Sequence, residues 1–243
     1  MIPKRAFFFW GGPGEMSWLR QQSIETFRRL NPEWAVDVCY RPGDNPVHRS
    51  DLFRYGELDA RGGVYFDTDI VFLKQFPEHL LDCDVGITIT DRLRFSNIGV
   101  LLASPQSTFY GAARTAAITR IENPKYSPDS YQALGVGLLN LMHLSALKMV
   151  PVKLDVCEDA FGRVERMYPG EKWLNLPETL ICPVQWDKLG TLYDGTHVDI
   201  PKESIGIHWF GGAQESKRFE WNVEHEPDDL PECCMSQALM VAV

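Results

Sequence analysis

The sequence has few of the features that mark membrane, secreted or disulfide-linked proteins. No apolar run approaches the length of about 18 residues that a membrane-spanning helix needs. The apolar run that follows Lys4 and Arg5 is too short for a signal-peptide core, and no small-residue cleavage site follows it. The 6 cysteines contain no CxxC pair. We therefore expect a cytoplasmic protein with reduced thiols and no membrane insertion.

Positive charge is also scarce. The chain has 24 basic and 33 acidic residues and a net charge of −9. Binding to duplex nucleic acid depends on Lys and Arg that neutralise phosphates, so a nucleic-acid partner is disfavoured without being excluded. Acidic residues gather near the C-terminus, where we expect a solvated tail over residues 226–243. These acids are Glu224, Glu226, Asp228, Asp229 and Glu232.

The remaining composition is that of a globular protein. Of the 243 residues, 44% are hydrophobic and 23% are charged, close to the average for globular domains. We find no internal repeat and no low-complexity linker. The sequence therefore indicates one domain over residues 1–225, followed by the acidic tail.

Strand-like and helix-like segments alternate along the chain, which favours an α/β fold. The expected strands span residues 5–10, 35–40, 64–66, 84–90 and 98–103, with short strands around Ile181 and Ile205. The expected helices span residues 17–30, 49–60, 106–121 and 131–147.

Two carboxylates follow the strand at residues 64–66. Side chains at positions i and i+2 of extended backbone point the same way, so Asp67 and Asp69 should face one spot. Two such charges about 4 Å apart repel by roughly 4 kcal/mol at an effective dielectric constant of 20. A hard divalent cation such as Mg²⁺ or Mn²⁺ would relieve this repulsion.

The helix before this strand carries a second charged pair. Asp51, Arg54 and Leu58 have i, i+3, i+7 spacing and share one helical face. The helix runs through Gly62-Gly63 into the strand that ends at the two aspartates. Asp51 and Arg54 could therefore reach the site of the cation, although the spacing equally fits an ordinary surface pair.

Together these residues resemble a known signature. The stretches Ser50–Tyr55 and Gly62–Asp69 resemble the SDxxRYxxLxxxGGxYxDxD pattern of sugar-nucleotide glycosyltransferases. The families concerned are the DXD sugar-binding, mannosyltransferase-like group and the glucosylating clostridial toxins. The start of the chain, Ile2-Pro3-Lys4 with Phe9–Gly12, and the segment Asn31–Trp34 are similar to further motifs of the same families. The resemblance implies a GT-A-type α/β/α sandwich with a mostly parallel central sheet.

The resemblance also implies a role for each matching residue of the donor site. Trp10 would stack on the nucleotide base, and Tyr65 would pack near the nucleotide. Asp51 and Arg54 would hold the sugar hydroxyls and the diphosphate of the donor. Asp67 would contact the ribose or the metal, and Asp69 would be a direct metal ligand.

The segment after the aspartates fits a related pattern. Residues 95–102 are similar to the FNAGVLL stretch of retaining galactosyl- and glucosyltransferases. By this resemblance Asn97 and Asp91 would contact the transferred sugar or the acceptor, and Asp91 is a candidate base. Residues 132–140 replace the Thr-Gly-Pro element that the family often has, and the glycines there can allow close approach to the acceptor.

The C-terminal candidate is the stretch 207–217. It resembles the HxxGxxKPW closure of such enzymes, in which a histidine is the third metal ligand and the following loop closes on the diphosphate. His208 would then bind the metal, and Gly211 and Lys217 would contact the donor. The chain departs from this pattern because Lys217 is not followed by Pro-Trp.

The resemblance thus predicts an enzyme that depends on Mn²⁺ or Mg²⁺ and moves a sugar from a nucleotide-sugar donor. UDP is the favoured nucleotide, and the acceptor is a glycan, a protein or a small molecule. Reaction with retention by front-face attack is the expected stereochemistry. Three other interpretations stay open: a dinucleotide-dependent oxidoreductase, a metal-dependent phosphohydrolase and a non-catalytic sugar-nucleotide-binding module.

Overall fold

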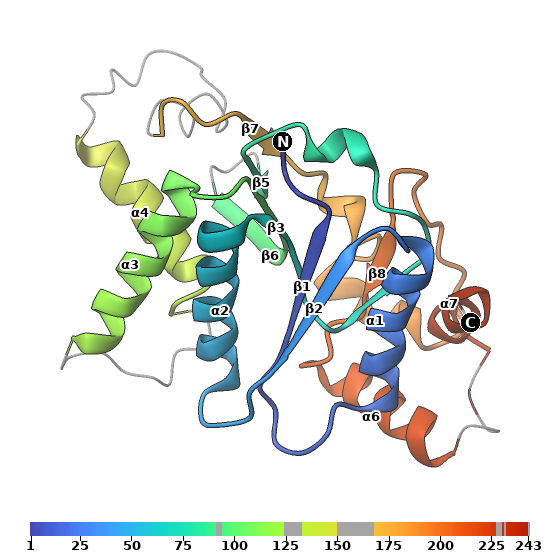
Figure 1. The fold of residues 1–243 in the computed structure, drawn as a ribbon. Coiled ribbons are helices and arrows are strands. Elements are labelled where there is room, and N and C mark those ends of the chain that lie inside the picture. Colours follow the sequence, from blue (N-terminus) through green and yellow to red (C-terminus); the bar gives the residue numbers. More distant parts are fainter. Residues whose placement is uncertain (91–93, 124–132, 150–167, 227–229, 231, 243) are drawn as a thin grey trace. The chain divides into compact units, whose positions relative to one another are not determined.

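The computed structural model describes residues 1–90, 94–123, 133–149, 168–226, 230 and 232–242 (Figure 1). These residues form two compact units, each made of segments that lie far apart in the sequence. Unit 1 comprises Met1–Pro13, Ala35–Phe66 and Glu78–Leu176. Unit 2 comprises Gly14–Trp34, Asp67–Pro77 and Pro177–Val243. Successive segments of the chain belong to one unit and then to the other, so the composition along the chain shows no boundary between the units. For this reason the sequence indicated one continuous domain.

Unit 1 is built on a six-stranded sheet with the order β2-β1-β3-β6-β5-β7. Its strands are β1 (Arg5–Trp10), β2 (Ala35–Tyr40), β3 (Gly63–Phe66), β5 (Val85–Thr90), β6 (Arg94–Ala103) and β7 (Trp173–Asn175). β1 pairs in parallel with β2 and β3, and β5 pairs in parallel with β7. β6 runs antiparallel to both β3 and β5. The expected fold class, α/β with a mostly parallel central sheet, is confirmed.

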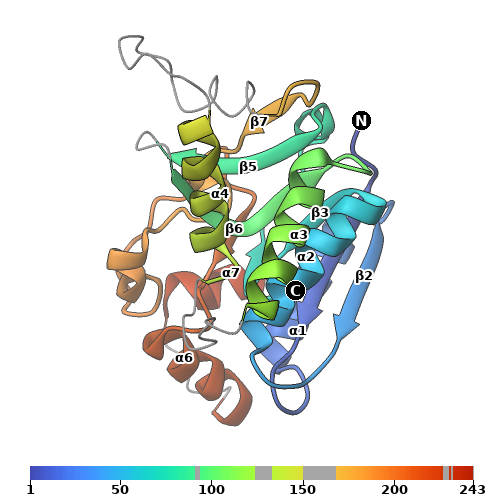
Figure 2. The same cartoon turned by 90° about the vertical axis from the view of Figure 1, so that its left-hand side faces the viewer.

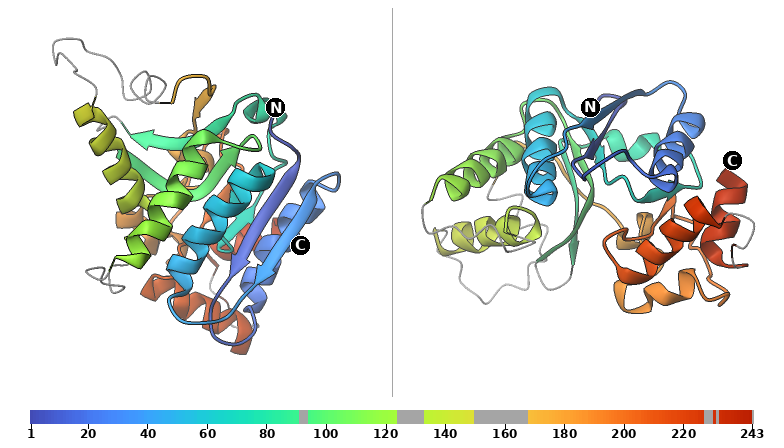
Figure 3. Two further views of the ribbon diagram at one scale, coloured as in Figure 1. Left: turned by 60° about the vertical axis from the view of Figure 1, so that its left-hand side comes forward. Right: turned by 90° about the horizontal axis from the view of Figure 1, so that it is seen from below.

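Three helices cover one face of this sheet. They are α2 (Pro46–Arg61), α3 (Thr108–Glu122) and α4 (Val136–Met149), and a short 3₁₀ helix, η1, spans Glu78–Leu81. Figure 2 shows α2, α3 and α4 in front of the strands, and they keep together in both panels of Figure 3. Side chains from the helices and the strands share one buried apolar core. Its members include Phe7, Tyr55, Leu58, Tyr65, Leu101, Phe109, Tyr110 and Leu134.

A glycine turn connects α2 to β3 and sets the start of the strand that precedes the aspartates. Gly62 ends α2 with φ +63°, in the left-handed region that favours glycine. A Cβ atom at Gly62 would lie 2.5 Å from the backbone nitrogen of Pro105. A side chain therefore fits here neither by conformation nor by space.

Unit 2 has a two-stranded antiparallel sheet surrounded by helices. The strands are β4 (Ile70–Phe72) and β8 (Gly206–His208). The helical segments are α1 (Trp18–Leu30), η2 (Glu178–Leu180), η3 (Trp186–Leu192), α6 (Gln214–His225) and α7 (Cys234–Ala242). Their apolar faces meet in a second core. It includes Leu19, Val71, Leu192, Trp209, Phe219, Met235 and Leu239.

Several predictions of elements need correction. The predicted strand around Ile181 is wrong, because Ile181 follows the 3₁₀ helix η2 instead. The helix predicted at 49–60 begins earlier, at Pro46, where proline suits the first helical position. The strand predicted at 98–103 begins at Arg94, and residues 131–132 of the last predicted helix lie outside the described residues.

The expected solvated tail contains a packed helix. Residues 234–242 form α7, and Met235 and Leu239 of this helix are buried in the core of unit 2. Apolar residues after Glu232 recur with helical spacing, so α7 has a face to bury. A division of the chain at residue 225 remains a prediction.

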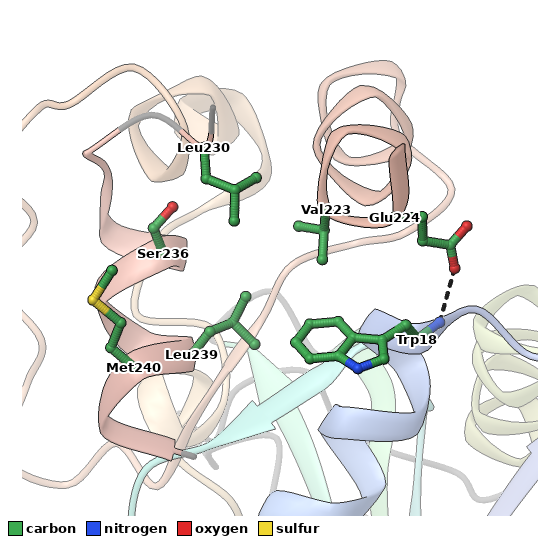
Figure 4. Close-up of a pocket in the computed structure, with 7 residues that line it drawn as sticks. All are labelled: Trp18, Val223, Glu224, Leu230, Ser236, Leu239 and Met240. Carbon is green, nitrogen blue, oxygen red and sulfur yellow. Dashed lines mark hydrogen bonds between the residues drawn. The ribbon is translucent and has the colours of Figure 1, made fainter. Parts of the chain in front are cut away.

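Unit 2 also has an apolar pocket of about 880 Å³. Figure 4 shows it between the start of α1, the end of α6 and helix α7. Its lining residues are Trp18, Val223, Glu224, Leu230, Ser236, Leu239 and Met240. The Glu224 carboxylate accepts a hydrogen bond from the backbone N–H of Trp18 at 2.8 Å. Among the described residues no helix has the length and apolar character that crossing a membrane requires.

Candidate functional site

The two aspartates and the histidine predicted as metal ligands lie together in unit 2. Asp67 and Asp69 occupy the short connection between β3 and β4, and His208 is the last residue of β8. The pairing of β4 with β8 places Ile70 opposite His208. The backbone N–H of Trp209 also donates to the carbonyl oxygen of Asp69 at 3.0 Å. The β4–β8 pair thus joins segments about 140 residues apart and fixes the spacing of the three side chains.

These three residues, named here the DXD–His cluster, have the geometry of a cation site. One ligand atom from each of Asp67, Asp69 and His208 lies within 4.8 Å of the others. The Oδ1 atom of Asp69 is 3.2 Å from Nε2 of His208. Two carboxylates and one imidazole suit Mn²⁺ well and Mg²⁺ through the oxygens.

The second carboxylate oxygen of Asp69 is held by the following loop. The backbone N–H of Gly211 donates to Oδ2 of Asp69 at 2.7 Å. Burial works to raise the pKa of Asp69, but His208, Arg20 and this backbone N–H together hold that pKa well below its usual range. Asp69 is therefore a carboxylate, the form that a metal needs.

Contacts with its backbone N–H, its ring nitrogens and its ring face hold His208 in place. Its backbone N–H donates to the carbonyl oxygen of Ile181 at 2.6 Å, and its Nδ1 atom lies 3.8 Å from Sγ of Cys182. The Phe210 ring stacks on the imidazole with centroids 4.2 Å apart, and Phe210 has a left-handed φ of +49°. Burial lowers the pKa of His208, but Asp69 and Cys182 outweigh it and raise that pKa well above its usual value. A metal cation would displace this proton from His208.

Sequence reasoning missed Arg20 of α1, which contacts the same loop. Its Nη1 atom donates to Oγ1 of Thr68, the middle residue of the DXD motif, at 3.1 Å. Its Nε atom donates to Glu220 of α6 at 2.9 Å, and its guanidinium lies over the Trp209 ring at 4.9 Å. No motif in the sequence marks this arginine, since a helix with neighbouring Arg and Glu residues has the pattern of a surface helix.

The other predicted residue of this loop, Lys217, has a different setting. It lies in the first turn of α6, and its side chain is exposed. Its backbone N–H donates to the carbonyl oxygen of Ala213 at 3.0 Å. A contact of Lys217 with the donor stays a prediction.

The second group of predicted residues lies in unit 1, where Arg54 is at the centre of a buried network. Arg54 donates to the carbonyl oxygen of Ile98 at 2.7 Å and to Oγ of Ser50 at 3.0 Å. Its Nε atom is 3.4 Å from Oδ1 of Asp51, and its guanidinium lies 4.4 Å from the centre of the Tyr65 ring. The Tyr65 hydroxyl hydrogen-bonds to Ser50 at 2.8 Å. The structure therefore brings Asp51, Arg54 and Tyr65 together, all three at most 4% exposed.

Three further residues of unit 1 complete the comparison with the sequence predictions. Trp10 ends β1 and is half-buried, with its ring so near Gly12 that a Cβ atom there would lie 2.5 Å from it. Asn97 accepts a hydrogen bond from the backbone N–H of Gly99 at 2.7 Å. A Cβ atom at Gly135 would lie 3.2 Å from both carboxylate oxygens of Asp51. Asp91 lies outside the described residues.

A family profile matches the part of the chain that holds both aspartates. Residues 20–86 match the family described as the glycosyltransferase sugar-binding region containing a DXD motif. This part of the chain is therefore similar to the DXD sugar-binding region of that family. This region includes Asp51, Arg54 and Tyr65 as well as Asp67 and Asp69, which agrees with the family expected from the sequence. No curated protein matches the chain.

Some solved structures of glycosyltransferases are distantly similar to this chain. The PaToxG glycosyltransferase is 14% identical over 69% of this chain and 84% of that chain, with a TM-score of 0.41. The glycosyltransferase GlyE from Streptococcus pneumoniae TIGR4 is 12% identical over 98% and 63%, with a TM-score of 0.39. The galactosyltransferase LgtC, solved with donor and acceptor sugar analogs, is 10% identical over 98% and 95%, with a TM-score of 0.43. Because the identities and TM-scores are this low, we draw no conclusion about the activity of this chain from these structures.

Proposed function

We propose that this protein is a metal-dependent glycosyltransferase that moves a sugar from a nucleotide-sugar donor to an acceptor. The observation that carries the proposal is the DXD–His cluster, whose two aspartates belong to the matched sugar-binding region. A UDP-sugar is the favoured donor, because the motif spacing resembles that of the glucosylating toxins.

The donor set of the cluster fits a divalent cation. Two carboxylates and one histidine leave other coordination positions open for the oxygens of a diphosphate. When bound there, Mn²⁺ or Mg²⁺ would supply charge stabilisation for the departing nucleotide diphosphate. Asp67, Asp69 and His208 are the residues that would hold it.

Neighbouring residues of unit 2 orient the side chains of the proposed metal ligands. The Gly211 N–H orients the Asp69 carboxylate, and the contact with Asp69 orients Nε2 of His208. Lys217, which is exposed in the first turn of α6, is the proposed cationic contact of the donor phosphates.

The family resemblance provides the proposed contacts with the rest of the donor. Trp10 stacks on the base, and Asp51 and Arg54 hold the sugar hydroxyls and the diphosphate, by the family resemblance. The proposed role of Arg54 is supported by the network that holds its guanidinium against Tyr65 and Ser50.

In the proposed reaction an acceptor hydroxyl attacks the anomeric carbon of the donor sugar. The new glycosidic bond forms as the bond between that carbon and the diphosphate oxygen breaks and the nucleotide diphosphate leaves, and Asp91, the proposed base, takes the proton of the acceptor hydroxyl. Retention by front-face attack is the proposed stereochemistry. Asn97 and Asp91 are the proposed contacts on the sugar and acceptor side. A glycan, a protein side chain or a small molecule fits this chemistry as acceptor.

Donor hydrolysis tests the proposal without knowledge of the acceptor. Purified full-length protein is incubated with a panel of UDP- and GDP-sugars, in Mn²⁺ or in chelator, and released nucleotide is measured. We expect release from one donor, dependent on the metal and fastest for a UDP-sugar. If every donor stays intact and no nucleotide binds, the proposal is wrong. Metal-dependent binding of a donor that is turned over neither alone nor with any acceptor tried would instead support the alternative of a non-catalytic sugar-nucleotide-binding module.

A further inference from the structure

Arg20 is the residue around which the loops of the DXD–His cluster are arranged. All of its guanidinium nitrogens lie against a neighbour within unit 2. Nε faces Glu220, Nη1 faces Thr68, and Nη2 lies where a Cβ atom at Gly211 would be only 2.0 Å away. The flat face of the guanidinium covers the Trp209 ring.

Thr68, Trp209 and Gly211 are each adjacent in sequence to a residue of the cluster or hydrogen-bonded to it. Thr68 stands between Asp67 and Asp69. Trp209 follows His208, and its backbone N–H donates to Asp69. Gly211 donates to the Asp69 carboxylate. One side chain of α1 thus contacts both segments that provide the proposed metal ligands.

Glu220 keeps Arg20 in this orientation. The side chains of Arg20 and Glu220 are only 12% and 16% exposed, so the pair is shielded from solvent screening. Glu220 also accepts a hydrogen bond from the hydroxyl of Ser17, the residue before α1. The carboxylate of α6 therefore anchors both the arginine and the beginning of its helix.

We propose that Arg20 is a positioning residue that sets the DXD loop and the Gly211 loop in the geometry required for cation binding. It acts through Thr68 and Gly211 rather than on the substrate. A lysine could not replace it, because an ammonium group is a point charge and lacks the planar fork that reaches three neighbours at once. The inference rests on the proposed metal-dependent function, but its loop geometry can be tested with no metal present.

Amide hydrogen exchange of the full-length, metal-free protein provides that test. The Gly211 amide reports directly, because its hydrogen bond to Asp69 depends on the loop geometry. We expect its exchange to accelerate by about tenfold or more in Arg20→Gln and equally in Arg20→Lys. The Leu73 amide, which donates to Ile205 in the same unit, is the reference for intact folding and should not change.

Two further variants control the interpretation. Arg28→Gln removes an arginine of the same helix that is 44% exposed and pairs with Glu25, and it should leave the Gly211 amide unchanged. Thr68→Val removes only the hydroxyl that accepts from Arg20, and it should accelerate exchange at Gly211. If exchange at the Leu73 amide also accelerates in the Arg20 variants, their folding is disturbed, and Thr68→Val then decides whether the contact of Arg20 with Thr68 sets the loop geometry.

Mn²⁺ binding, followed by the electron paramagnetic resonance signal of the free ion, gives the second readout. We expect Arg20→Gln and Arg20→Lys to bind Mn²⁺ about 10-fold or more weakly, as for other residues that orient metal ligands. A wild-type protein that binds no Mn²⁺ would contradict the proposed function, while the exchange result would still decide the role of Arg20. Unchanged Gly211 exchange in folded Arg20→Gln and Thr68→Val variants would overturn the inference, and full rescue by Arg20→Lys would show that only charge matters.

Discussion

Asp69 shows how far the chemistry of a single residue depends on partners that are distant in the sequence. The proximity of Asp67 and Asp69 was predicted from strand alternation, although the structure has Thr68 and Asp69 in a turn between β3 and β4. His208 was predicted only through a family resemblance, since a histidine after a short strand has no local signature of a ligand. Arg20 and the Gly211 N–H could not be predicted, because their roles arise from contacts across about 50 and 140 residues of sequence.

Gly211 offers a prediction at the scale of one residue. A Cβ atom there would lie 2.0 Å from Nη2 of Arg20 and 2.8 Å from the Trp209 ring, so in Gly211→Ala both side chains or the loop itself must shift. We expect a loss of about 1–3 kcal/mol in stability, as for other overpacked sites, together with weaker Mn²⁺ binding. Thermal unfolding and Mn²⁺ titration measure the two effects.

Gly212 is the matched control for this change. A Cβ atom at Gly212 would meet no atom within 4 Å, so Gly212→Ala should change neither the unfolding temperature nor the Mn²⁺ affinity. Equal behaviour of the two alanine variants would show that the space next to Arg20 is not tightly filled.

At the scale of elements, local patterns predicted some segments and missed others. The bounds of β1 and β2 were predicted correctly, because each is a short apolar or alternating run that ends at turn-forming residues. The three-residue strand β4 was missed, since so short a run has no periodicity. The antiparallel direction of β6 was also not predicted, because strand direction depends on connections rather than on local pattern. Helix α6 was missed because charged residues dominate it and few apolar residues mark its buried face.

Asn31, at the end of α1, gives a prediction for the packing of elements. Its side chain accepts from the backbone N–H of Phe76 at 2.8 Å and donates to the carbonyl oxygen of Phe27 at 3.0 Å. Asn31→Ala would leave the buried Phe76 N–H without this partner, at a cost of about 1–3 kcal/mol in the free energy of unfolding. Urea denaturation measures the loss, and Glu33→Ala, at an exposed position, should stay within about 0.5 kcal/mol of wild type. An Asn31→Ala variant as stable as the control would show that the two hydrogen bonds of the Asn31 side chain do not stabilise the protein.

At the scale of the whole molecule, the chain forms two cores from alternating segments. The α/β class was predictable from the alternation of strand-like and helix-like segments, whereas the mostly parallel sheet was predicted only from the family resemblance. The two interleaved units were not, because the chain passes between them several times with no linker-like composition at the crossings. The residues of the DXD–His cluster lie entirely in unit 2, whereas Asp51, Arg54 and Tyr65 lie in unit 1.

Cation binding should stabilise the folded protein as a whole. A ligand that binds only the native state at 100 times its dissociation constant contributes about 2.7 kcal/mol. We therefore expect Mn²⁺ to raise the unfolding temperature of the wild type and a chelator to reverse the rise. The His208→Ala variant should show little or no rise, and an equal rise in this variant would place the cation elsewhere.

Nucleotide release by wild type and Asp69→Asn, measured side by side with the donor that the panel selects, tests the central claim most directly. Asn is close in size to Asp but lacks the charge, so we expect Asp69→Asn to lose Mn²⁺-dependent release by about 100-fold or more. Asp82→Asn, which alters an exposed carboxylate in unit 1, should release nucleotide like the wild type. Undiminished, metal-dependent release by a folded Asp69→Asn variant would contradict the assignment of the DXD–His cluster as the metal site of a glycosyltransferase.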